Sequence, residues 1–483
     1  MTLPADPALM TAAELSAAIR ARHLSCREVM LAHLDRIDRY NPAANAIVSL
    51  RPREELLAEA DERDAQLAHG EVLGWMHGLP HAVKDLAHVR GLPTSFGSPM
   101  MAGNIAVQDQ LTVERMRRAG AIIIGKTNVP EFGLGSHSFN PVHGVTRNAY
   151  DPSRSAGGSS GGAAVALALR LQPVADGSDF GGSLRNPAAW NNVFGLRPSA
   201  GRVPSWPATE GFVSQLSTDG PMARTVTDLA LLLSTLAGRD ARAPLSLEDK
   251  PEVFAQPLAA DPKGLRIGWL GDYARSLPME PGVLAVCQQG LDRLSEIGCR
   301  VEEAKLPVSR EQIWDTWLGI RHWLVMNSLL PFYNDPDRRA QLKPEAVWEV
   351  EGGLRMSAAD TLRASSQRST LYQAFLGLFS RFDALVLPSA QCFPFPAEWR
   401  WPQEIDGTAM DTYHRWMEVV FPASLAGCPT ISVPAGFGGA ADLPMGLQII
   451  APPRQDLALL RLAHAYEQAA APVLARLPAV LAG

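Results

Sequence analysis

Apolar residues recur every three to four positions in the first part of the chain, with polar residues between them. This spacing predicts amphipathic helices. Thr11, followed three residues later by Glu14, marks the start of the first helix. We expect a second helix from residue 25 until Asn41-Pro42 stops it, and a third, mostly polar helix over residues 54–67. Residues 1–70 are therefore predicted to form a helical cap packed on the core.

From residue 79 onward, short apolar runs alternate with helical patterns. Strands are expected at 82–83, 121–124, 265–270, 384–388 and 430–434, and helices at 111–119, 163–169, 283–297 and 456–469. The segment 163–169 is apolar all round, which predicts a buried helix. Strand and helix patterns in alternation favour an α/β fold with a mostly parallel or mixed sheet.

The chain shows no internal repeat and no long low-complexity linker, so we expect residues 71–483 to form a single domain with its core at about 79–205. Residues 240–264, rich in proline and charged residues, are expected on the surface. Residues 311–330 read as a helix that carries Trp314, Trp317 and Trp323. Two interpretations stay open: these rings pack the core, or the helical region 305–380 lines an apolar substrate pocket.

Composition narrows the function classes. Of the 483 residues 46% are hydrophobic, enough for a large core, and the formal net charge of −6 carries no electrostatic footprint for nucleic acid. The five cysteines are scattered and lack Cys-x-x-Cys spacing, which disfavours a disulfide framework and a zinc site. The N-terminal residues lack an apolar signal region, and no run approaches about 20 apolar residues. We expect a cytoplasmic monomer or homodimer without cofactor, metal, nucleic acid or membrane partner.

Two glycine- and serine-rich segments, 157–162 and 177–183, are candidates for the chemistry. Glycine permits positive φ and close approach of backbone N–H groups to a ligand, so such loops commonly surround an anionic centre. A solvated linker is the plain alternative, but a buried helix is expected directly after Gly162. We therefore predict a serine hydrolase site.

The base that such a site needs is less obvious. Residues 157–161 match Gly-x-Ser-x-Gly, a nucleophile pattern that should follow a buried strand, yet residues 147–154 are polar and turn-like. None of His322, His414 and His464 stands in a distinctive motif. Lys84 follows a short apolar strand and precedes Asp85; alone it reads as a surface charge, but a buried lysine can become a neutral base.

The order of motifs decides between these bases. Lys84-Asp85, then the glycine-serine segment 157–162, then residues 177–188 closely resemble the amidase signature family of serine hydrolases. Segments 120–128, 151–154, 195–198, 201–203, 423–434 and 443–448 resemble it as well, so the likeness spans nearly the whole chain. The resemblance implies a central twisted mixed sheet flanked by helices on both faces.

The resemblance also implies a Ser–cis-Ser–Lys triad: Ser183 is the nucleophile, Ser159 the bridging serine on a cis peptide bond, and Lys84 the base. The other implied roles are an oxyanion hole from the backbone N–H groups of Phe180, Gly181, Gly182 and Ser183, and salt bridges of Arg154, Asp179 and Arg185 that brace the loops. Ser160 and Ser178 are expected to bond to the backbone, and His137 to be a satisfied loop residue.

The implied activity is hydrolysis of the C–N bond of small amides through a seryl acyl-enzyme, with esters, anilides and carbamates as further substrates. Phe180 stands where the family often has threonine, and together with the many tryptophans it favours apolar or aromatic substrates. The family also contains the glutamine-hydrolysing component of glutamyl-tRNA amidotransferase, so an amidotransferase component of this A type is one alternative. A catalytically silent binding protein of the same fold is another.

Overall fold

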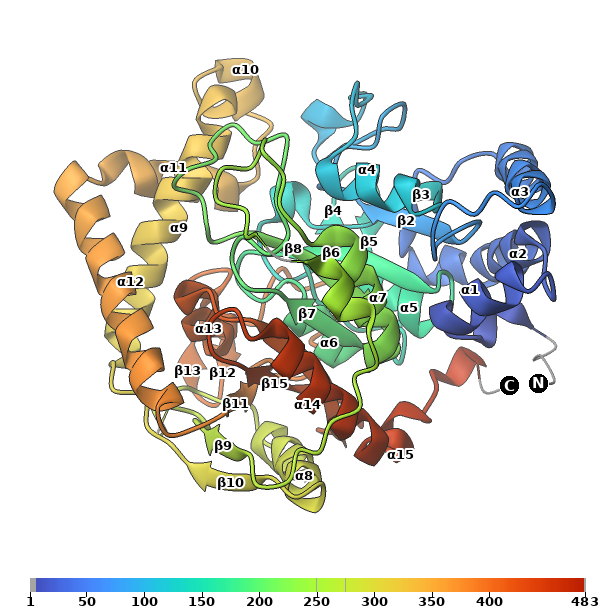
Figure 1. Ribbon diagram of the computed structural model, residues 1–483. Coiled ribbons are helices and arrows are strands. Elements are labelled where there is room, and N and C mark those ends of the chain that lie inside the picture. Colours follow the sequence, from blue (N-terminus) through green and yellow to red (C-terminus); the bar gives the residue numbers. More distant parts are fainter. Residues whose placement is uncertain (1–5, 249, 274, 482–483) are drawn as a thin grey trace.

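The computed structural model describes residues 6–248, 250–273 and 275–481. Its main sheet contains β6 (Val174–Asp179), β7 (Phe194–Arg197), β8 (Thr218–Ala223), β9 (Arg266–Trp269), β10 (Arg300–Glu303), β11 (Ala384–Pro388), β14 (Thr430–Gly438) and β15 (Leu443–Ile450). The strand order is β10-β9-β11-β15-β14-β7-β8-β6, with parallel pairing from β10 to β11 and antiparallel pairing beyond (Figure 1). The prediction of an α/β fold with a mixed sheet is confirmed.

Helices cover both faces of this sheet. Neighbouring residues on a strand point to opposite faces, and Gly446 of β15 faces Ala189 of α6 (Arg185–Trp190). Met445, one residue earlier, pairs with Gly436, which faces Val286 of α8 (Val283–Glu296). The surrounding helices are α5 (Gly161–Ala168), α7 (Val226–Leu236), α13 (Phe421–Ala426), α14 (Asp456–Ala469) and α15 (Ala471–Leu474).

A smaller sheet positions Lys84. It consists of β1 (Ile47–Val48), β3 (Ile122–Thr127) and β2 (Pro80–Lys84), with β2 and β3 parallel. All five residues of β2 are buried, so Lys84 is carried into the interior as the last residue of the strand. The short pairs β4 (Phe139–Asn140) with β5 (Gly144–Val145) and β12 (Glu404–Ile405) with β13 (Thr408–Ala409) complete the strands.

The N-terminal helices are α1 (Ala12–Arg20), α2 (Cys26–Ala44) and α3 (Arg53–Ala68), followed by α4 (Leu111–Arg118). Thr11 and Glu14 form the expected capping box. The prediction that α2 stops at Asn41-Pro42 is wrong, because the helix continues to Ala44. Pro42 lies in the last turn, where it removes only one helical hydrogen bond, and Asn45 ends the helix at a φ of 50°.

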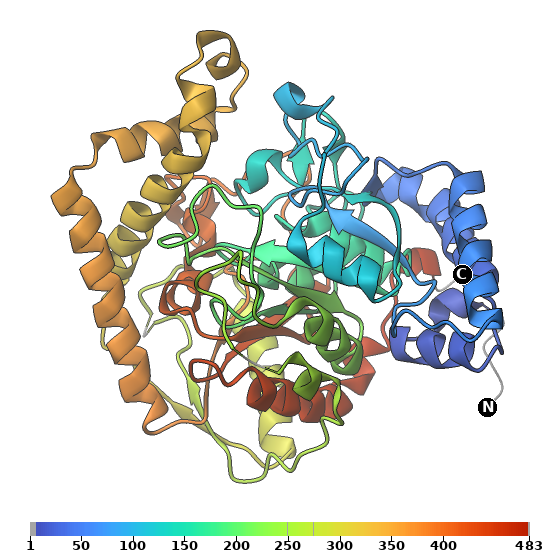
Figure 2. The ribbon, with the colours of Figure 1, turned by 45° about the horizontal axis from the view of Figure 1, so that its top comes forward.

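One group of helices projects from the side of the sheet, at the left of Figure 1 and again in Figure 2. It contains α9 (Arg310–Tyr333), α10 (Pro336–Arg339), α11 (Pro344–Arg355) and α12 (Ala358–Phe379). The long helix α9 packs against α11, α12 and α13. Its Trp314 and Trp317 are buried, whereas Trp323 is half-buried.

The second glycine-serine segment is more regular than a loop. Residues up to Asp179 belong to β6, and α6 begins at Arg185, so only residues 180–184 form a turn. Glycine at position 177 allows the two glycine-serine segments to approach closely. Any side chain there would place its Cβ only 2.7 Å from Ser160 Oγ. Strand pairing with β8 therefore presents the turn directly beside the first segment.

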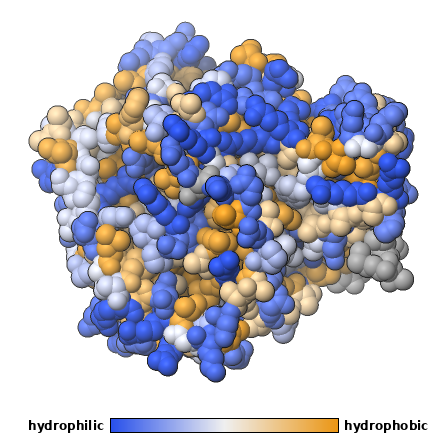
Figure 3. Space-filling model, viewed as in Figure 1, coloured by the Kyte–Doolittle hydropathy of each residue, from blue (hydrophilic) through white to orange (hydrophobic). Residues whose placement is uncertain are grey.

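The face in Figure 3 shows polar residues with apolar residues scattered in small groups between them. Within the part of the chain that the structure describes, no helix has the length and apolar character needed to cross a membrane.

Candidate active site

Lys84 is the centre of the polar cluster. Its Nζ lies 2.9 Å from Ser159 Oγ, 2.8 Å from Ser160 Oγ, and 3.0 and 3.1 Å from Ser178 Oγ and the Ser178 carbonyl oxygen. The side chain is buried, with 1% of the residue exposed. The expectation that Ser160 and Ser178 bond to the backbone is wrong for their hydroxyl groups, which contact this lysine instead. Three serines thus hold one amine.

Burial also changes the charge of this amine. Desolvation lowers the pKa of Lys84 to about 7, although the carboxylates of Asp219, Asp176 and Asp179 favour the charged form. A lysine with a pKa near neutrality is partly uncharged at physiological pH. Lys84 can therefore accept a proton where an exposed lysine could not.

Ser159 lies on the loop just before α5. The peptide bond between Gly158 and Ser159 is cis. Residues of a neighbouring segment hold the loop: Ser136 donates to the Gly158 carbonyl oxygen, and Ser138 Oγ accepts the N–H of Gly161 at 3.1 Å. The Ser159 hydroxyl thereby points at the lysine from a backbone fixed on both sides.

Ser183 lies in the turn between β6 and α6, with 5% of the residue exposed. Its carbonyl oxygen accepts the N–H of Ser160 at 3.3 Å, which joins the two glycine-serine segments. Among the described residues, its hydroxyl has no hydrogen-bond partner. The structure thus brings Lys84 and Ser159 into contact and brings the Ser183 backbone beside them, without a bond between the two serine hydroxyls.

The backbone N–H groups of this turn are not equivalent. The N–H of Gly182 donates to Asp179 Oδ1 at 2.8 Å, and that of Leu184 to Asp179 Oδ2 at 3.1 Å. The N–H groups of Phe180, Gly181 and Ser183 have no acceptor within the described residues. Of the four N–H groups expected to form an oxyanion hole, that of Gly182 is thus bonded to Asp179, and the other three are unpaired within the described residues.

Asp179 holds the turn in place through the hydrogen bonds that its carboxylate accepts from Gly182 and Leu184. It is fully buried, and its carboxylate accepts from Arg185 Nε and Nη2, each at 3.0 Å, and from Arg197 Nη1 at 3.2 Å. Burial by itself raises the pKa of this carboxyl, but the two guanidinium groups hold it well below its ordinary value. Arg185 also reaches Gln448 at 2.8 Å. Arg197 on β7 and Gln448 on β15 stand in segments 195–198 and 443–448, which carry the family resemblance, but sequence reasoning assigned them no role.

Arg154 does not join this network. Its Nε lies 3.6 Å from Asp151 in the same loop, and about a third of its side chain is exposed. His137 is satisfied, since its ring nitrogens lie 2.7 Å from Ser155 Oγ and 2.9 Å from the Ala397 carbonyl oxygen.

Aromatic rings close over the turn from α9 and α13. The Phe180 ring meets Trp317 edge to face at 5.7 Å, and Trp317 stacks on Phe421 at 3.8 Å. A Cβ at Gly181 would lie 2.3 Å from Trp317 Cη2, so only glycine allows this approach. Trp317 therefore packs directly on the turn that carries Ser183.

A buried ion pair supports these rings. The Arg321 guanidinium lies 5.2 Å from the centre of the Phe180 ring, and its Nε donates to Glu349 at 2.6 Å. The hydroxyl of Tyr413 also contacts Arg321 and Glu349. Sequence reasoning missed this pair; the signal was an arginine four residues after Trp317, in the tryptophan-rich part of the helix.

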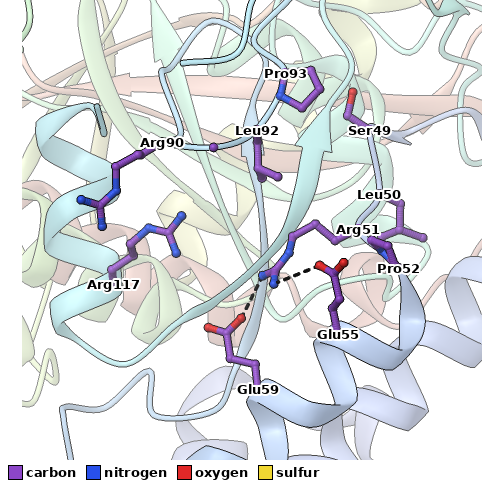
Figure 4. Close-up of a pocket in the computed structure, with 11 residues that line it drawn as sticks. Ser49, Leu50, Arg51, Pro52, Glu55, Glu59, Arg90, Leu92, Pro93 and Arg117 are labelled. Carbon is purple, nitrogen blue, oxygen red and sulfur yellow. Dashed lines mark hydrogen bonds and ion pairs between the residues drawn. The ribbon is translucent and has the colours of Figure 1, made fainter. Parts of the chain in front are cut away.

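Figure 4 shows a separate polar pocket of about 550 Å³, which shares no lining residue with the Lys84 cluster. Arg51 points into it and is paired with Glu59 at 2.9 Å and Glu55 at 3.7 Å. The pocket holds no candidate nucleophile beside a base, so we place the chemistry at Lys84. In the described ranges, no group of three or more His, Cys, Asp or Glu side chains could hold a metal ion.

Comparison with known proteins identifies the family of this chain. The family model Amidase matches residues 28–460. An acylamidase of Rhodococcus erythropolis is 36% identical over 460 residues, and the match covers 95% of this chain and 95% of the relative. The A-type component of the glutamyl-tRNA(Gln) amidotransferase of Acidothermus cellulolyticus is 36% identical over 483 residues, covering 95% of this chain and 94% of the relative.

Solved structures give the same picture. A bacterial aryl acylamidase of the amidase signature enzymes superposes with a TM-score of 0.88 at 29% identity, covering 95% of this chain and 96% of that one. The peptide amidase of Stenotrophomonas maltophilia gives a TM-score of 0.80 at 28% identity, with 97% and 98% covered.

Proposed function

The chain belongs to the amidase signature family and is an amidase, and from that premise we propose that it hydrolyses small apolar or aromatic amides through an acyl-enzyme on Ser183. The observation that carries the proposal is the contact of 2.9 Å between Lys84 Nζ and Ser159 Oγ in a buried site. Lysine replaces histidine as the base because burial makes its neutral form accessible near pH 7.

Acylation follows from this arrangement. Lys84 takes the proton of the Ser159 hydroxyl, Ser159 takes that of Ser183, and Ser183 Oγ attacks the carbonyl carbon. The carbonyl oxygen becomes an oxyanion, which the free N–H groups of the turn stabilise. The Lys84 ammonium then returns its proton through Ser159 to the leaving nitrogen, and the C–N bond breaks.

Deacylation repeats the relay with water. Lys84, neutral again, removes a proton from water through Ser159, and the resulting hydroxide attacks the ester carbonyl. Collapse of the second oxyanion breaks the bond to Ser183 Oγ, which recovers its proton from the relay. The products are a carboxylic acid and an amine.

The rings around the turn support an apolar or aromatic substrate. Phe180 is half-buried beside the reacting serine, and Trp317 and Phe421 lie behind it. We infer that helices of region 305–380 line the substrate pocket. The names of the relatives, acylamidase and aryl acylamidase, agree with this class. Esters, anilides and carbamates fit the same route; a carbamate would carbamoylate Ser183 before carbon dioxide leaves.

Turnover of a mixed panel tests the proposal. The purified chain is incubated with an anilide, an alkyl amide, an aryl ester, a carbamate and glutamine. We expect the anilide to be cleaved faster than glutamine, and Ser183→Ala to lose all of this turnover while keeping the wild-type melting temperature. Equal turnover by Ser183→Ala would overturn the assignment of the nucleophile.

A second candidate is glutamine hydrolysis for a partner enzyme, favoured by the 36% identity to an A-type amidotransferase component over nearly the whole chain. Ammonia release from glutamine, without turnover of the anilide, would support it.

The five cysteines are buried and unpaired, which supports our proposal of a cytoplasmic protein. That it is a monomer or homodimer stays a prediction, which sedimentation equilibrium tests.

A further inference from the structure

A small cavity borders Lys84 but neither Ser159 nor Ser183. Its volume is about 20 Å³, and its polar walls include Asp176, Asp219 and Gln110. A polar space of this size holds about one water molecule. The base therefore has a second polar neighbourhood besides the serines that the reaction uses.

Asp219 approaches the base through strand pairing. It lies on β8 directly opposite Ser178 of β6, and opposite residues in an antiparallel pair point to the same face. Ser178 contacts Lys84 Nζ through its hydroxyl and its carbonyl oxygen. Asp219 makes no ion-pair contact with Lys84; its Oδ2 accepts from Gln110 at 3.2 Å. Asp219 and Lys84 thus both line the small cavity without direct contact between their side chains.

The carboxylate also faces the outside. Asp219 lines a second pocket of about 620 Å³ that the segments 201–219 and 241–246 form. It is half-buried, between this pocket and the small cavity. Asp219 therefore lines both the small cavity beside Lys84 and the larger outer pocket.

Other charged groups surround Lys84 on every packed element. They are His81 and Asp85 near β2, Lys126 on β3, Asp176 and Asp179 on β6, and Asp219 on β8.

Two of these carboxylates are paired with cations. Asp179 is paired with Arg185 and Arg197, whereas Asp176 accepts a hydrogen bond from His81 at 3.0 Å. Asp85 lies 3.5 Å from Lys126. Among the described residues, Asp219 has no cationic side chain in ion-pair contact. Asp219 is therefore a carboxylate near Lys84 whose charge no arginine or lysine of the described chain offsets through ion-pair contact.

We propose that Asp219 is a positioning residue of the amidase reaction, whose carboxylate acts across the small cavity to stabilise the positive charge that Lys84 gains when Ser183 is deprotonated. This inference rests on the proposed function. Asp219 itself gains and loses no proton in the step. The proton of Ser183 passes to Ser159 and that of Ser159 to Lys84, and one proton then returns from Lys84 through Ser159 to the leaving nitrogen.

The titration of the two groups agrees in sign. Asp219 is the largest of the charges that raise the pKa of Lys84 against desolvation, which leaves it at about 7. Burial and Asp176 raise the pKa of Asp219 to about 6, so it is ionised where Lys84 works. Removing this carboxylate must lower the pKa of Lys84 and weaken it as a base.

The test is the pH profile of kcat/KM for an anilide. In Asp219→Asn the rise of activity with pH should move by about 1 pH unit to lower pH, and the plateau should fall by about tenfold. A purely structural role for Asp219 would change the plateau without moving the profile. Asp219→Ser removes the same charge and replaces Asp219→Asn if that variant does not fold. Melting temperature monitors folding.

Glu404→Gln, which removes an exposed carboxylate in β12, is the control and should keep the wild-type profile. An unmoved profile in the folded Asp219 variants, with Ser183→Ala inactive, would overturn the inference and leave the proposed function standing. An equal shift in Glu404→Gln would also overturn it. Absence of amide turnover in the wild type would instead overturn the proposed function.

Discussion

At the level of single residues, the proposed mechanism requires a lysine, Lys84, that loses its positive charge. Lys84 is enclosed by three serines and lies near three carboxylates. Burial lowers the pKa of its amine, whereas the carboxylates raise it. Burial prevails and lowers the pKa to about 7. Since the neutral amine is the active form, wild-type kcat/KM should rise with pH through about 7 and level off above it. A profile flat from pH 5 to 9 would contradict the lysine base.

Lys84→Arg and Lys84→Ala test the same residue by substitution. Arginine keeps the positive charge but does not deprotonate in proteins, so both variants should lose at least about 10³-fold in kcat. Lys263→Ala, at an exposed lysine, is the matched control and should retain full activity. Stopped assays with the anilide measure the loss; Lys84→Arg with near-normal turnover would exclude the proposed role.

Phe180→Thr tests the pocket. The ring packs on Trp317 and lies under Arg321, and its loss opens space beside the reacting carbonyl. We expect kcat/KM for anilides to fall by about tenfold relative to that for alkyl amides, because an apolar contact is removed from the aromatic group. An unchanged ratio of the two values would show that Phe180 does not set substrate preference.

At the scale of elements, local patterns predicted most helices and strands. The capping box at Thr11, the buried strand before Lys84 and the apolar helix after Gly162 all appear where the sequence indicates them. The strand β6 was not predicted, because glycine and aspartate disfavour strands and only its pairing with β8 stabilises it. The contacts of Ser160 and Ser178 with Lys84 and the pair of Arg321 with Glu349 were missed, since they depend on contacts distant in sequence.

Gly181→Ala tests how helix α9 meets the turn. The added methyl group would lie 2.3 Å from Trp317, which is held against Phe421, so the turn must shift. We expect a loss of about 1–3 kcal/mol in unfolding free energy and of about 10² in kcat, because the free N–H groups move. Gly377→Ala, in α12 where nothing lies within 4 Å, is the matched control and should not destabilise. Wild-type kinetics in Gly181→Ala would contradict a tightly packed turn.

At the scale of the whole molecule, the site assembles segments that are far apart in the chain. Lys84 comes from the small sheet, Ser159 from the loop before α5, Ser183 from the turn after the edge strand of the main sheet, and Trp317 from the projecting helices. Asp228 of α7 accepts the N–H groups of Ala12 and Ala13 at 2.9 Å each and so ties α1 to the main sheet layer. That residues 1–70 act as a separate cap stays a prediction.

In the proposed reaction, Ser183 carries the acyl group while Ser159 only relays protons. Reaction with a fluorophosphonate, followed by peptide mass spectrometry, tests it most directly, because four serines of the site are distinguished in one measurement. We expect a single adduct on Ser183, which is absent from Ser183→Ala and forms much more slowly in Lys84→Ala. An adduct on Ser159, Ser160 or Ser178 in the wild-type protein would contradict it.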